Sequence, residues 1–235
     1  MSQELALLLA AAASIGVVHT VLGPDHYVPF IAMGRARNWS LRKTLGIAAA
    51  CGAGHVISAL GLGALAFALG WATGGVERLE AVRGRLAGWL LLGFGLAYAA
   101  WGIRHALRNR PHRHWHAHHD GTVHSHQHGH HGAHAHVHDV KGRSLTPWVL
   151  FVIFVLGPCE PLVPLLLVPA ATGDPTGVAL VALTFGLCTL TTLLALVAVG
   201  RLGLSRLPFG PLERYSHAVA GAALAACGLA IQLGL

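Results

Sequence analysis

Charged residues are scarce in this sequence. Asp, Glu, Lys and Arg make up 11% of its 235 residues, whereas hydrophobic residues make up 54%. Soluble domains carry about 25% charged residues, so this composition excludes an ordinary soluble domain and indicates a protein embedded in a lipid bilayer. The pI near 9.9 does not indicate a nucleic-acid partner, because the basic residues flank apolar segments and are not interleaved with aromatic residues.

Cysteine is also rare, and several common motifs are missing. The four cysteines all lie inside apolar segments, which excludes a secreted disulfide framework: Cys51, Cys159, Cys188 and Cys227. Glu4 and the lack of Lys or Arg at the N-terminus predict that residues 5–21 form a retained span and not a cleaved signal peptide. No Gly-x4-Gly-Lys-Ser/Thr loop is present, so ATP does not drive this protein directly. We expect no enzyme activity.

The apolar segments are long enough for six membrane spans, since a helix rises about 1.5 Å per residue and must cross about 30 Å. The predicted spans are 4–22 with a broken continuation to 34, 44–70, 85–107, 145–171, 177–200 and 214–235. Residues 71–84 are predicted to form a loop with one helical turn at most. The fold class predicted is therefore an all-α polytopic membrane protein.

An internal repeat divides the chain into two halves. Val-Leu-Gly-Pro occurs at 21–24 and again at 155–158, and each copy breaks a span. Gly88 and Gly95 recur as Gly221 and Gly228, and such small residues allow helices to approach closely. We predict a 3+3 inverted repeat with broken helices 1 and 4, and two broken helices in corresponding places indicate a transporter site. The domains expected are 1–107, a His-rich loop at 108–144, and 145–235.

The basic residues predict the orientation. Thirteen of the 16 Lys and Arg residues fall in the loops after spans 1, 3 and 5, on one side of the membrane. Basic loops stay in the cytoplasm. We therefore expect a bacterial-type inner-membrane protein with both termini outside and the His-rich loop in the cytoplasm.

The polar residues at the two breaks are the candidate site. His19, Asp25 and His26 surround the first break, and ionisable groups inside a membrane usually have a function. Imidazole and carboxylate are ligands for divalent transition metals, although a His–Asp pair that only holds helices together is the alternative. Cys159 and Glu160 take the matching place in the second half, where a thiolate or carboxylate would complete a mixed site.

Two further groups of histidines add to this pattern. His55 lies in the second span beside Gly54, and it is either a ligand or proton relay or a helix–helix hydrogen-bond donor. A His-rich loop alternates histidine with small residues, a composition typical of loose, multi-site metal binding, although a solubilising linker is the alternative. Its histidines are His112, His114, His116, His118, His119, His124, His126, His128, His130, His131, His134, His136 and His138.

Three features of the sequence resemble motifs of the nickel/cobalt transporter superfamily, in particular its six-span NicO-like and urease-accessory-protein-H-like members. These features are His19-x5-Asp25-His26, Gly54-His55 and the His-rich loop. The spacing and the loop are similar to those of efflux members, although uptake members share the Asp. The resemblance implies transport of Ni²⁺ or Co²⁺ as substrate, with His19, Asp25, His26, His55, Cys159 and Glu160 along the path. It also implies a cytosolic metallochaperone as partner, and it leaves the direction and the oligomeric state open.

A second resemblance gives the alternative function. Gly157-Pro158-Cys159-Glu160-Pro161 is similar to the Pro-Cys-x-x-Pro element of the membrane thiol–disulfide carriers of cytochrome c biogenesis, which share the inverted repeat. Redox exchange of that type needs two cysteines, but the first half has Asp25 in the matching place. We therefore expect shared architecture without shared chemistry. A metal sensor or chaperone without transport is a further alternative, and export of an anion is disfavoured because no buried Arg or Lys is predicted.

Overall fold

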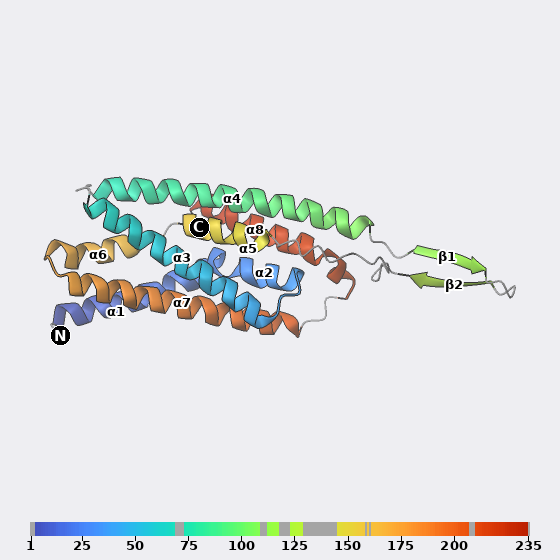
Figure 1. Ribbon diagram of the computed structural model, residues 1–235, viewed down its shortest axis with the longest axis horizontal. Helices are drawn as coiled ribbons and strands as arrows, with labels where there is room; N and C mark the ends of the chain where they lie inside the picture. The colour runs from blue at the N-terminus through green and yellow to red at the C-terminus, as the bar shows by residue number, and fades with distance from the viewer. Residues whose placement is uncertain are drawn as a thin grey trace.

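Apolar helices form nearly all of the part of the chain that the computed structural model describes (Figure 1). The described residues are 3–68, 73–108, 112–117, 123–128, 145–157, 159, 161–206 and 210–234. The helices are α1 (Gln3–Leu22), η1 (Pro24–His26), α2 (Val28–Ala36), α3 (Leu41–Ala68), α4 (Thr73–Arg108), α5 (Thr146–Leu156), α6 (Leu162–Ala171), α7 (Pro175–Ser205), η2 (Gly210–Tyr215) and α8 (Ser216–Leu233).

Five of these helices, α1, α3, α4, α7 and α8, are long and apolar enough to cross a membrane. Large hydrophobic side chains point outward along them: Leu22 is 74% exposed, Ile57 67% and Trp89 61%. A soluble protein would expose such a surface to water at a large cost, whereas lipid tails cover it without one. The predicted all-α membrane class is confirmed at this level, and the chain is a multi-pass membrane protein.

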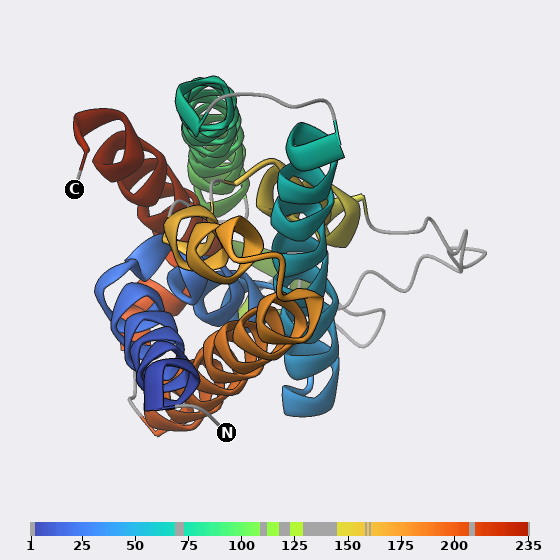
Figure 2. The same ribbon diagram turned by 90° about the vertical axis from the view of Figure 1, so that its left-hand side faces the viewer.

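The helices pack as close pairs, with α4 beside α8 and α1 beside α7 (Figures 1 and 2). Glycines set the α4–α8 distance. A methyl group at Gly221 would overlap the backbone of Ala99, and one at Gly95 would overlap that of Ala225. The repeat of Gly88 and Gly95 as Gly221 and Gly228 thus predicted the residues of this contact correctly, because small side chains let two helix backbones touch.

Both predicted helix breaks are present. The first separates α1 from α2 at Gly23, and the second separates α5 from α6 after Gly157. Proline lacks a backbone N–H and clashes with the preceding turn, so the Gly-Pro pairs end both helices. Pro29 does not break α2, because it lies in the first turn, where its missing N–H has no intrahelical partner to lose.

One prediction about an irregular segment was wrong. Residues 71–84 were expected to form a loop, but α4 begins at Thr73 and continues through them. Val76 and Glu80 are buried one turn apart on one helix face, so internal packing stabilises this turn despite its charges. The His-rich segment contains an antiparallel hairpin of β1 (His112–Ala117) and β2 (Val123–His128), in which His112 lies opposite His128. Alternation of histidine with other residues has the two-residue period of a strand.

Candidate functional site

The first break presents two histidines toward the interior of the helix bundle. His19 lies in the last turn of α1, and His26 ends η1 three residues after Gly23. The His26 N–H donates to the Gly23 carbonyl at 3.0 Å, which closes this tight turn. A side chain at Gly23 would lie 2.5 Å from Nδ1 of His26. Only glycine therefore leaves room for the His26 ring in this position.

His55 joins these two rings from α3. One ring nitrogen from each of His19, His26 and His55 lies within 4.8 Å of the others, and among the described residues this is the one such group with a metal-binding composition. The ring centroids of His19 and His26 are 4.7 Å apart, and those of His26 and His55 are 5.5 Å apart. His26 and His55 are 7% and 4% exposed. We call these three residues the three-His group.

Asp25 stands beside the three-His group, on the side away from its centre. Its Oδ1 lies 3.3 Å from Nδ1 of His26, while Nε2 of His26 has no hydrogen-bond partner. Asp25 was predicted to be a ligand alongside His19 and His26. The structure places it where a carboxylate orients an imidazole and increases its basicity, as in carboxylate–histidine–metal triads.

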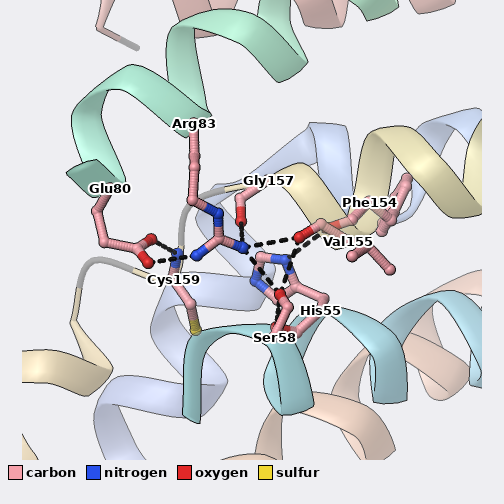
Figure 3. A network of polar contacts seen from close by, with 8 residues as sticks. All are labelled: His55, Ser58, Glu80, Arg83, Phe154, Val155, Gly157 and Cys159. Atoms are coloured by element: carbon pink, nitrogen blue, oxygen red, sulfur yellow. Dashed lines mark hydrogen bonds and ion pairs between the residues drawn. The ribbon is translucent and has the colours of Figure 1, made fainter. Parts of the chain in front are cut away.

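The second break is held by a polar network that the sequence did not predict (Figure 3). Glu80 and Arg83 of α4 form an ion pair, and Arg83 Nη2 donates to the Val155 carbonyl at 2.7 Å and to Ser58 Oγ at 2.8 Å. The Cys159 N–H donates to Glu80 Oε2 at 3.1 Å. The end of α5 leaves carbonyls without helical partners, and these cannot stay unpaired in a membrane. The network therefore satisfies the backbone of the break.

Sequence reasoning missed Glu80 and Arg83 because residues 71–84 were assigned to a loop. The prediction that no Arg or Lys is buried was wrong as well, since the Arg83 side chain is only 13% exposed. The signal was present: Glu80 and Arg83 stand at i,i+3 spacing in a segment without proline, and such pairs face each other on a helix.

Cys159 is fully buried between α5 and α6, against Ala12, Ala59 and Phe185. It does not belong to the three-His group, although the sequence predicted a mixed site of both. None of the four cysteines is disulfide-bonded. Glu160 lies outside the described residues. Of the loop histidines, His112, His114, His116, His124, His126 and His128 lie in the two strands, and the others are outside the described residues.

A comparison with protein families matches residues 28–230 to the cytochrome c biogenesis protein transmembrane region. No curated protein and no solved structure matches the chain. The match corrects two predictions: the resemblance to nickel/cobalt transporters was wrong, and so was the function of nickel or cobalt transport based on it. The first predicted ligands, His19, Asp25 and His26, lie before the matched residues. A few ligand residues indicate only a local metal site, whereas the family match extends over residues 28–230. Because the match covers most of its length, the chain belongs to the cytochrome c biogenesis transmembrane family.

Proposed function

We propose that this chain is a membrane thiol–disulfide carrier of the cytochrome c biogenesis type, with Cys159 as its reactive thiol. The observation that carries the proposal is the position of this residue. Cys51, Cys188 and Cys227 lie within the regular helices α3, α7 and α8, whereas Cys159 lies at the break between α5 and α6. A cysteine at a helix break can change its exposure when the two segments move, and one inside a straight helix cannot do so without helix rotation.

The surroundings of Cys159 suit a thiol that reacts only after it is uncovered. The Glu80 carboxylate, paired with Arg83, accepts the Cys159 N–H at the break (Figure 3), and the sulfur is fully buried, whereas the nucleophile in exchange is an accessible thiolate. A cavity of about 640 Å³ lies between α3, α6 and α7. Ala59 and Leu162 line it and also pack in the cluster around Cys159. Movement of α6 into this space would uncover the sulfur.

With a single reactive cysteine, both exchange partners must be other molecules. The Cys159 thiolate attacks a disulfide of an extracytoplasmic acceptor protein, which forms a mixed disulfide and releases one acceptor thiolate. A dithiol protein from the cytoplasm then attacks the Cys159 sulfur and releases the second acceptor thiolate. The second donor thiol closes the donor disulfide and frees Cys159. The net change is one acceptor disulfide reduced and one donor dithiol oxidised.

Exchange with both compartments implies a topology in which the breaks lie near the membrane centre. We propose that α1–α2 and α5–α6 each cross as a broken span, which gives six crossings and two inverted halves, 1–107 and 145–235. In this arrangement both termini are extracytoplasmic, and residues 108–144 are cytoplasmic. The distribution of Lys and Arg supports this orientation, and the two broken helices support the repeat.

The test uses the full chain in liposomes. A peptide with a fluorogenic disulfide is enclosed in the lumen, and a thioredoxin-like dithiol protein is added outside. The wild type should reduce the peptide, and Cys159→Ser should fall to the rate of protein-free liposomes, with the mixed disulfide absent by mass spectrometry. Cys227→Ser is the matched control, because Cys227 is also buried, and it should keep the wild-type rate. Wild-type flux in Cys159→Ser, or none in the wild type, would refute the proposal.

A further inference from the structure

We infer that His19, His26 and His55 bind one transition-metal ion as a resident centre inside the helix bundle. Nothing in the thiol chemistry of Cys159 requires such a centre, and the inference stands independently of it. Three imidazoles from α1, η1 and α3 meet where the first break enters the bundle. Imidazole nitrogen is a preferred ligand of zinc and copper ions.

Hydrogen bonds fix two of the rings in the form that binds metal. Nδ1 of His26 lies 3.1 Å from the Gly23 carbonyl, and Nδ1 of His55 lies 3.1 Å from the Phe154 carbonyl. A carbonyl oxygen can only accept, so Nδ1 must carry the proton in both neutral rings. Nε2 of each ring then presents a free lone pair. Metal-bound histidines use this arrangement, in which the second nitrogen donates to a carbonyl or carboxylate.

The three Nε2 atoms are buried and have no hydrogen-bond partner. Leaving a buried polar atom unpaired is costly, so a group that served only to pack helices would be expected to pair these nitrogens. A bound cation accepts all three lone pairs at once. One water molecule could satisfy all three rings only with His19 in the opposite tautomer, donating from Nε2 while the other two accept.

The distances between the ring nitrogens fit a single ion. The ring nitrogens lie within 4.8 Å of one another, whereas ligands at about 2.0–2.1 Å from zinc are separated by roughly 3.4 Å. Small rotations of the rings would close this difference. Asp25, next to His26, supplies a negative charge that offsets part of the charge of the ion.

The experiment measures metal retained by the purified full chain. Protein stripped with a chelator is loaded with zinc(II) or copper(I), washed with a competing chelator, and analysed for metal per chain. The His-rich segment is identical in every variant, so any metal that it holds cancels in a difference. Wild type should retain one ion more than His55→Gln or His19→Gln. His217→Gln is the control, because His217 is a helix histidine whose Nδ1 lies 2.8 Å from the Tyr98 hydroxyl, and it should match wild type.

Two results would overturn the inference. The first is equal retention of both metals by wild type, His19→Gln and His55→Gln, which would leave water or packing as the role of the three rings. The second is an equal loss in His217→Gln, which would show a general effect of removing a histidine. Two separate ligand variants guard against misfolding of one, and each is checked by size-exclusion chromatography before loading. Loss of metal binding would leave the thiol-exchange assay with Cys159→Ser unaffected, so the two proposals fail separately.

Discussion

Removing Arg83 should destabilise the fold more than removing Arg83 together with the charge of Glu80. The Glu80 side chain is 3% exposed and is paired with Arg83, and it also accepts the Cys159 N–H. In Arg83→Met the buried carboxylate loses its counter-charge. Breaking a buried ion pair from one side typically costs about 3–5 kcal/mol, because an uncompensated charge remains.

The double variant Glu80→Gln/Arg83→Met removes both charges and keeps an amide oxygen that can accept the Cys159 N–H. The Val155 carbonyl still accepts from Ser58 Oγ at 2.8 Å. The remaining cost is the loss of the Arg83 hydrogen bonds, roughly 1–2 kcal/mol. The double variant should thus be more stable than Arg83→Met alone by about 2 kcal/mol.

Unfolding of the full chain by SDS titration in mixed micelles, followed by circular dichroism, gives the free energies for this cycle. Arg85→Met is the matched control, since Arg85 lies on the same helix with its side chain exposed, and it should change stability by less than about 0.5 kcal/mol. A double variant that is less stable than Arg83→Met would show that the pair is not coupled as the structure indicates. A loss in Arg83→Met no larger than that in Arg85→Met would contradict the burial of the pair.

Two further predictions concern packing and topology. Gly95→Ala should destabilise the protein by about 1–3 kcal/mol in the same titration, because its methyl group would overlap the backbone of α8. Gly93→Ala is the control and should be neutral, because Gly93 lies on the same helix and a methyl group there would meet no atom within 4 Å. Equal effects of the two substitutions would contradict the α4–α8 contact. A reporter fused after Leu235 should be extracytoplasmic and one inserted near Gly132 cytoplasmic; the reverse labelling pattern would invert the proposed topology.

The parts of the fold that were predicted depend on local chemistry. Gly23 and Gly157, each followed by proline, end their helices because proline disrupts any helix, whatever surrounds it. His19, Asp25 and His26 were predicted to form one site, and His55 was predicted to be either a ligand or proton relay or a helix–helix hydrogen-bond donor. The structure brings the three histidines together, because ionisable groups in an apolar span are costly unless they face one another. Such signals can be recognised in the sequence without knowledge of the tertiary contacts.

The parts that were missed depend on contacts between distant segments. Glu80 and Arg83 resemble loop residues by hydropathy, since each charge alone is unfavourable in a membrane. Their cost falls only when they pair with each other and with the backbone at Val155 and Cys159, about 70 to 80 residues away along the chain. The family assignment failed for a related reason. Short histidine motifs, at residues 19–26, at His55 and in the His-rich loop, outweighed a pattern that extends over residues 28–230.

The end of α5 connects the two candidate centres. His55 and Ser58 lie one turn apart on α3, and they bond to the consecutive carbonyls of Phe154 and Val155. Opening the break to expose Cys159 must either release these carbonyls or carry the end of α5 along. Either movement disturbs the hydrogen bond that sets the tautomer of His55, and a metal bound by His55 would resist it. The buried thiol and the three-His group should therefore influence each other. The thiol-exchange assay, run with and without bound zinc, measures this coupling. Equal rates would show that the break opens without moving the end of α5.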